Sequence, residues 1–184
     1  MKTKWNLDNM HSEVQFKVKH LVISTVTGTF GKYDAEVETD GDNFETARIH
    51  FTIDVNSIST GNSQRDGHLK SADFFDTANF PNADFISTSV KKTGENSFVL
   101  KGNLTIRGTT RPVELHAEFG GTTKDSYGNL KAGFEVTGKI KRKEFGLHWD
   151  AVTDAGSVVV SDEVKILANV QFAKVVPETK EAIA

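Results

Sequence analysis

Apolar and polar side chains alternate with a period of two through most of the chain, which is the pattern of half-buried β-strands. Residues 14–20, VQFKVKH, place Val14, Phe16, Val18 and His20 on one face and three polar side chains on the other. The pattern predicts eight or nine strands. The same alternation recurs in segments 33–38, 47–55, 98–106, 113–119, 130–140 and 164–172, with shorter strands near 3–8 and 83–90.

The links between these segments are short and contain turn residues, such as Gly41–Asp42, Gly94–Glu95 and Gly120–Gly121. Short links of this kind join antiparallel neighbours. Because each strand has one apolar and one polar face, the sheet is expected to close on itself or to pack on a second sheet, and closure into a barrel removes exposed edges. The predicted fold is therefore all-β and antiparallel, with a single domain at 1–175 and a loose tail at 176–184.

The longest predicted strand, residues 128–141, would span roughly 45 Å at about 3.3 Å per residue, so a barrel built from it is deep. Small residues on the apolar faces leave interior volume that only a ligand or large side chains from other strands can fill. We favour a ligand cavity, with phenylalanines filling the gaps as the alternative. These small residues are Ala35, Ala47, Gly102, Ala117, Ala132, Gly138 and Ala168.

The alternation stops between Ser57 and Asn82, in a connection far longer than a hairpin loop. It is too rich in phenylalanine to be disordered. Asn62 or Ser63 could cap a short helix here, which Gly67 would weaken. We predict a short helical lid that lays Leu69, Phe74 and Phe75, together with Phe80, over one end of the barrel.

Two sets of polar residues are candidates for chemistry. His68 beside Asp66 has the composition of an acid–base pair, but a spacing of two places them on different helix faces. Arg65 and Asp66 are better explained as a latch that pins the segment, and His68 as a latch or a head-group contact. His20 ends an apolar face and could meet a ligand's polar head, or it could be an ordinary hydrogen-bonded rim residue.

Other sequence features exclude several functions. His11, His50, His116 and His148 have no metal-ligand spacing, and no nucleotide-binding or nucleophile-elbow motif is present. The basic run at 139–143 is expected to be a solvated strand end that could also face an anionic head group. No cofactor, metal or catalytic set is therefore predicted.

Composition supports an apolar interior and narrows the partners. Thirteen phenylalanines stand against two tyrosines, and the formal net charge is −3 without a basic stripe, which disfavours nucleic acid. No cysteine and no long apolar run occur, so neither disulfides nor a membrane-spanning helix are expected. The N-terminus has no apolar signal region, so a cytoplasmic location is expected, or a periplasmic one if a signal was removed.

Six segments, in this order, are similar to those of the YceI-like family, over roughly residues 3–174. The resemblance implies an extended eight-stranded lipocalin-like barrel with a helical cover and a tunnel for a long apolar molecule, and frequent pairing as homodimers. Family members are associated with polyisoprenoids, isoprenoid quinones and fatty-acid amides, and many are exported. The segments are WNLDNMHSEVQFKVKH at 5–20, GTFGKYDAEV at 28–37, DVNSISTGNSQRDGHLKSADFFD at 54–76, FPNADFIS at 80–87, GNLTIRGTTRPVEL at 102–115 and RKEFGLHW at 142–149.

We accordingly predict a non-enzymatic carrier or binding protein for a polyisoprenoid, an isoprenoid quinone or a fatty-acid-like chain. Two alternatives are an enzyme acting on an isoprenoid or quinone, with His68, Asp66 or His20 as its base, and a stress-related interaction module with a packed core. The residues predicted to line the tunnel are Phe16, Val18, Phe51, Phe85, Leu104, Leu115, Phe134 and Ile166.

Overall fold

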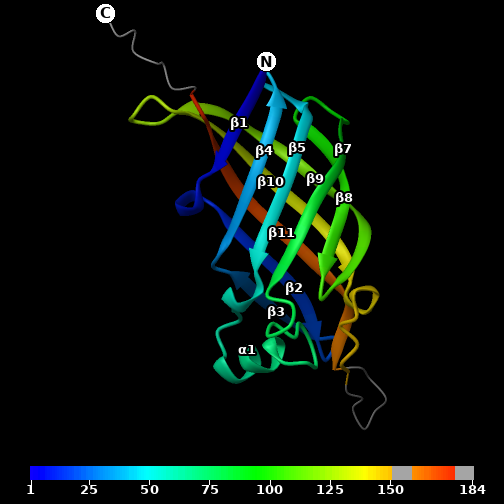
Figure 1. Cartoon of the computed structure of the whole chain (residues 1–184). Coiled ribbons are helices and arrows are strands. Elements are labelled where there is room, and N and C mark those ends of the chain that lie inside the picture. The colour runs from blue at the N-terminus through cyan, green and yellow to red at the C-terminus, as the bar shows by residue number, and fades with distance from the viewer. Residues whose placement is uncertain (151–158, 177–184) are drawn as a thin grey trace, which may run out of the picture.

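The computed structural model describes residues 1–150 and 159–176 (Figure 1). The chain forms one antiparallel sheet with a single α-helix, α1 (Ser63–Lys70), among these residues. Three short 3-10 helices interrupt it: η1 (Asn9–His11), η2 (Val55–Ser57) and η3 (Arg142–Phe145). The strands are β1 (Lys2–Leu7), β2 (Glu13–His20), β3 (Ser24–Phe30), β4 (Tyr33–Asp40), β5 (Asn43–Asp54), β6 (Ile58–Ser59), β7 (Asn82–Lys92), β8 (Ser97–Ile106), β9 (Thr109–Lys124), β10 (Leu130–Lys141) and β11 (Val160–Lys174).

The sheet closes into a barrel because β11 pairs with two segments on the same side. Its first part pairs with β2, from Val160–His20 to Asn169–Glu13, and its last residues pair with β1. β1 and β2 are therefore one long barrel strand interrupted by η1. β4 pairs with β1 and β3 pairs with β2, so β3 and β4 form a second interrupted strand. The barrel thus has eight strand positions, and the predicted all-β eight-stranded fold is confirmed.

The two ends of the barrel differ. One end, called the lid end from here on, has α1, η2 and β6, together with the turn between β2 and β3 (Figure 1). The N-terminus and the β4–β5 and β7–β8 turns lie at the opposite end (Figure 1). The tail predicted at 176–184 lies, from residue 177 onward, outside the described residues.

Helix α1 begins where the sequence indicates. The Asn62 side chain accepts a hydrogen bond from the Arg65 backbone N–H at 3.0 Å, so Asn62 rather than Ser63 is the N-cap. The helix is only eight residues long, as expected with Gly67 in its interior. No helix in the described part of the chain is both long and apolar enough to cross a bilayer.

The apolar core consists of three clusters along the barrel axis. Trp5 and Val37 belong to the cluster at the end opposite the lid, and Phe85 and Leu100 belong to the middle one. Phe145 is at the centre of the cluster at the lid end. The interior is thus lined with apolar side chains along its whole length, and burying them is the main driving force for this fold.

Candidate functional site

The barrel interior contains a cavity of about 180 Å³. Every residue that lines it is Val, Leu, Ile, Phe or Ala, so the surface offers no side-chain hydrogen bond. The lining comes from β2, β4, β5, β7, β8, β9, β10 and β11, that is, from all around the barrel. The site is therefore shaped to accept an apolar molecule and to exclude a polar one.

Small interior residues have two different outcomes. Ala47, Ala117 and Ala168 lie in the cavity lining and leave space open. At Gly102 and Gly138, by contrast, the Phe85 ring and the Leu115 side chain occupy the place where a Cβ would stand. The sequence analysis considered a cavity and filling by large side chains as alternatives, and the structure has both. Neighbouring side chains fill the space at these two glycines, and a cavity remains at the three alanines.

Of the eight side chains predicted to line a tunnel, the structure brings six together around the cavity. Phe16 and Val18 lie elsewhere. Phe16 lays its ring over Gly28 of β3 and packs on Phe30 at 5.5 Å between ring centroids. Val18 lies closer to the lid end, between Val26 and Val164. The six in the lining are Phe51, Phe85, Leu104, Leu115, Phe134 and Ile166.

Phe44 lines the cavity but was not predicted from the sequence. Its even position is out of phase with Ala47, Ile49 and Phe51 on the same strand. The pairing of β4 with β5 shifts register beyond Glu38, and this irregularity lets both phases face inward. A bulge of this kind leaves no clear signal in a single sequence.

An aromatic cluster closes the cavity at the end opposite the lid. The Phe44 ring centroid lies 5.0 Å from those of Trp5 and Phe134 and 5.6 Å from that of Phe119. Trp5 is buried, and its indole N–H donates to the Thr39 hydroxyl at 3.0 Å. This hydrogen bond fixes the indole and with it the base of the cluster.

At the lid end, the predicted lid residues cover the core rather than the cavity itself. Phe74 is buried, and Phe75 meets Phe30 edge to face at 6.4 Å. Neither they nor Leu69 line the cavity. Between lid and cavity lies the cluster around Phe145, with Val55, Ala83, Ile106 and Leu147. This end of the barrel is therefore filled by the protein's own side chains.

The polar residues of the lid hold the segment to itself. Asp66 accepts from the backbone N–H and the hydroxyl of Thr60, at 2.9 and 2.6 Å. Arg65 donates to the same hydroxyl and to the Thr60 carbonyl, at 2.7 and 2.8 Å. Both residues thus tie the start of α1 to the chain that precedes it, which is the geometry of a latch.

The two candidate histidines lie outside the cavity. The His68 Nε2 atom is 2.9 Å from a carboxylate oxygen of Asp73, and its ring packs edge to face on Phe74 and Trp149. His20 ends β2, opposite Ser24 and Val160, and does not line the cavity. Neither histidine is placed to act on a molecule held in the interior.

Arg142 of η3 is buried, contrary to the prediction for its sequence segment. The basic run 139–143 was expected to be a solvated strand end, which is wrong for this residue, whose side chain is only 3% exposed. Its guanidinium donates to the carbonyls of Leu147, Trp149, Ser161 and Val160 at 2.7 to 3.0 Å. Burial lowers the pKa of Arg142, while Asp150 and Asp162 oppose that shift. Arginine nevertheless stays charged, so this cation joins η3 to the start of β11.

The barrel wall is incompletely hydrogen-bonded between β5 and β7. Their ladder covers only His50–Asp54 with Asn82–Ile86. Beyond it, the Ile49 backbone N–H donates to the Ser87 hydroxyl at 2.9 Å. The rest of β5 (43–48) and β7 (88–92) form no ladder with each other, and we call this stretch the β5–β7 seam. Phe44, Ala47 and Val90 line the cavity at the seam, so side chains rather than backbone hydrogen bonds close it.

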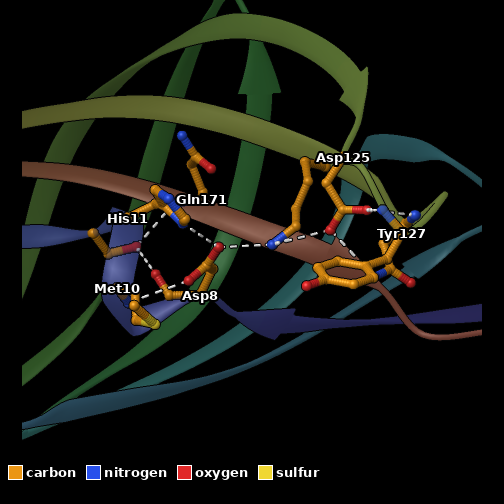
Figure 2. Close-up of polar contacts among 9 residues, drawn as sticks. Asp8, Met10, His11, Asp125, Tyr127 and Gln171 are labelled. Carbon is orange, nitrogen blue, oxygen red and sulfur yellow. Dashed lines mark hydrogen bonds and ion pairs between the residues drawn. The ribbon is translucent and has the colours of Figure 1, made fainter.

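A group of linked charged side chains lies at the break between β1 and β2 (Figure 2). An Asp8 carboxylate oxygen is 2.6 Å from Lys131 Nζ and 2.7 Å from His11 Nδ1. Asp125 lies 4.0 Å from the same lysine. The Asp8 backbone also accepts from Ser12, and its N–H donates to Gln171 of β11 (Figure 2). The described residues contain no group of side chains suited to hold a metal ion, so we assign this cluster to joining the β1–β2 break to β10 and β11.

Asp8 should contribute to stability in a pH-dependent manner. The Lys131 hydrogen bond, opposed by burial and aided by His11, lowers the pKa of Asp8 from 3.8 to about 2. A carboxyl whose pKa is lowered in the folded state stabilises the fold at every pH above its ordinary pKa. This contribution is lost as the pH falls from about 4 to about 2. We expect Asp8→Asn to lower the free energy of unfolding by about 2 kcal/mol at neutral pH, measured by urea denaturation.

The same measurement at low pH tests the cause. The difference between Asp8→Asn and the parent protein should shrink steadily as pH is lowered through that range. Asp42→Asn is the control, because Asp42 pairs with Lys174 at an exposed site and should cost less than about 1 kcal/mol. A loss for Asp8→Asn that does not change with pH would contradict the ion-pair explanation.

Comparison with known proteins gives consistent matches along the whole barrel. The family model of the YceI-like domain matches residues 5–172. Protein YceI of Salmonella newport is 40% identical over 168 residues, which cover 91% of this chain and 84% of that protein. Protein YceI of Salmonella arizonae gives the same identity and coverage.

Solved structures show the same fold. BcnA of Burkholderia cenocepacia superimposes with a TM-score of 0.76 at 25% identity, covering 90% of this chain and 98% of that one. The Campylobacter jejuni YCEI protein gives a TM-score of 0.73 at 34% identity, and the match covers 84% of this chain and 88% of that one. A polyisoprenoid binding domain from Saccharophagus degradans, implicated in plant cell wall breakdown, gives a TM-score of 0.64 at 18% identity. The match covers 92% of this chain and 97% of that one, and at this identity it supports the fold alone.

Proposed function

Because the chain belongs to the YceI-like domain family, we propose that its barrel binds a long apolar molecule in the interior. The observation that supports this most is the cavity, which is lined by apolar side chains from all around the barrel. An apolar cavity of roughly 150 Å³ can stay dry and take up a small hydrocarbon. A space of about 180 Å³ is therefore large enough to draw in part of an apolar chain.

The ligand classes we propose are a polyisoprenoid, an isoprenoid quinone or a fatty-acid-like chain. Each CH₂ moved from water into the cavity contributes about 0.8 kcal/mol, so a few sheltered carbons already give useful affinity after the costs of association. The lining has no polar side chain that could select a head group. Discrimination between chains of similar thickness should consequently be weak. The solved polyisoprenoid binding domain of the same fold is consistent with this choice.

We propose binding rather than catalysis. The enzyme hypothesis needs a base facing the ligand, but His68 is held by Asp73 and His20 lies at the end of β2. Neither lines the cavity. Asp66 uses its carboxylate to hold Thr60. The homodimer and the cellular compartment considered above remain predictions.

We propose the β5–β7 seam as the route by which the ligand enters. The lid end is filled by the cluster around Phe145, and the opposite end is closed by rings around Phe44. Separating β5 from β7 along the seam breaks no ladder hydrogen bond, whereas separating β10 from β11 would break a ladder of eleven residue pairs. Entry from the side through the seam thus requires no loss of ladder hydrogen bonds.

Mass spectrometry of the purified, monodisperse protein tests the proposed function. We expect native spectra to show a co-purifying apolar mass, and organic extraction to release it with a stoichiometry near one per barrel. Reloading the extracted protein with a defined polyprenol should restore the mass shift. A folded protein that yields no lipid and takes up none on reloading would contradict the proposal and favour the packed interaction module.

A further inference from the structure

The turn between β2 and β3 exposes three consecutive large apolar side chains. Leu21, Val22 and Ile23 are 39%, 66% and 86% exposed. In the described part of the chain no other run of three exposed large apolar residues occurs. We call these residues the apolar tip. It lies at the lid end of the barrel (Figure 1).

The backbone of the apolar tip is strained. Leu21 and Val22 have φ values of +54° and +66°. Glycine and asparagine adopt this left-handed conformation readily, whereas a β-branched residue such as Val22 is a genuine outlier there. The turn therefore has residues that suit neither its conformation nor its exposure to water. Strain of this kind is found where the residues have a task other than folding.

A row of lysines lies directly behind the tip on the outer face of the barrel. Lys17 of β2 is the direct cross-strand neighbour of Lys165 of β11, and Lys165 is in turn the direct neighbour of Lys139 of β10. Like charges in direct cross-strand positions destabilise a sheet. Lys19 and Lys141 lie two residues further along the same faces, toward the lid end. We call these five residues the lysine row.

Acidic neighbours do not neutralise the row. Glu163 faces Lys141 and lies 3.8 Å from Lys139. Glu114 and Glu144 lie in the same outer groove as four of the lysines. Within residues 1–150 and 159–176, Lys17, Lys19, Lys141 and Lys165 form no ion pair, and the Lys19 ammonium group donates only to the Thr25 hydroxyl. The surface behind the tip keeps a positive excess.

We propose that the apolar tip and the lysine row form a docking surface for an anionic lipid bilayer. An apolar segment inserts about 5–10 Å into the interface of a bilayer, and basic side chains beside it meet the anionic head groups. Lys17 is four residues from Leu21, about 13 Å along the strand. With the tip inserted, the lysine row comes within about a Debye length of the head groups at physiological salt.

This surface goes beyond the proposed binding of an apolar molecule and does not depend on the route by which that molecule enters the barrel. Long apolar chains reside in membranes and hardly dissolve in water. A barrel docked on a bilayer is therefore held beside the phase in which such a ligand resides. Vesicle binding and ligand extraction are separate measurements, so either can fail while the other holds.

Sedimentation with vesicles tests the docking surface. The intact protein is mixed with vesicles of pure phosphatidylcholine, or of three parts phosphatidylcholine to one part phosphatidylglycerol. We expect binding to the anionic vesicles that weakens as salt is added. Lys17→Gln with Lys165→Gln should weaken it about 25-fold, at about fivefold per lysine. Lys91→Gln with Lys92→Gln on β7, an equal charge change at the opposite end, should have no such effect.

Val22→Asn separates docking from folding. Asparagine tolerates a positive φ, so the thermal midpoint should rise, while removal of an apolar side chain from the tip should weaken vesicle binding about tenfold. Equal binding to neutral and anionic vesicles, or none to either, would overturn the proposal. So would a dimer that Val22→Asn converts to a monomer without any vesicle binding, because the tip would then be covered by a second copy.

Discussion

Replacing Arg142 with methionine should lower the free energy of unfolding by about 3–5 kcal/mol, because the buried cation leaves several polar partners behind. Methionine keeps an unbranched stem of similar reach but donates no hydrogen bond. The carbonyls of Leu147 and Val160 and the carboxylate of Asp150 would then lose their guanidinium partner. Urea denaturation followed by tryptophan fluorescence measures the loss.

Two further variants make this result interpretable. Lys143→Met removes a neighbouring cation that pairs with the same Asp150 at 3.3 Å but is 43% exposed, so it should cost less than about 1 kcal/mol. Arg142→Lys retains the charge without the planar fork of donors and should fall in between. If Arg142→Met were as stable as Lys143→Met, the buried network would not be what holds η3 to β11.

Filling the cavity should abolish ligand binding without unfolding the barrel. Ala117 of β9 lines the cavity between Phe98 of β8 and Val136 of β10. A phenylalanine there occupies space that the ligand needs. Excluding about four CH₂ groups costs roughly 3 kcal/mol of binding, so the affinity for all-trans-retinol, a fluorescent isoprenoid alcohol, should fall by at least about 100-fold.

The control for this variant lies on the same strand. His116→Phe adds the same ring to an outward, exposed position next to Ala117, and should leave retinol affinity within about twofold. Because Ala117→Phe can strain the core by about 1–3 kcal/mol, its free energy of unfolding is measured alongside. Retinol binding by a folded Ala117→Phe protein at the parent affinity would place the ligand outside this cavity.

The strand faces follow from alternation, and so do most residues around the cavity. Phe51, Phe85 and Leu115 face inward because the period of two puts them with their apolar neighbours, and the register keeps that phase. The cap at Asn62 is also a local property, since it depends on one side chain and the amide three residues later. Local patterns of this kind can be predicted from the sequence.

The errors come from non-local packing. Phe16 shares the phase of Val14, but Gly28 on the next strand leaves a space for its ring, and no pattern within β2 signals this. Phe44 turns inward because of a register shift. Arg142 lies in a basic run that is typical of a solvated strand end, but the returning chain at 159–161 supplies carbonyls that bury it. Each outcome depends on a neighbouring strand or segment and not on the element that carries the residue.

The β5–β7 seam also bears on how much the protein can hold. A barrel that is hydrogen-bonded all the way round has a fixed circumference, so its capacity is set once by the number and tilt of its strands. Here the wall between residues 43–48 and 88–92 is held by side-chain contacts alone. Contacts with an apolar ligand can replace those side-chain contacts with little change in free energy. The girth of this barrel can therefore vary with its contents, so thicker or longer guests could be held by the same fold.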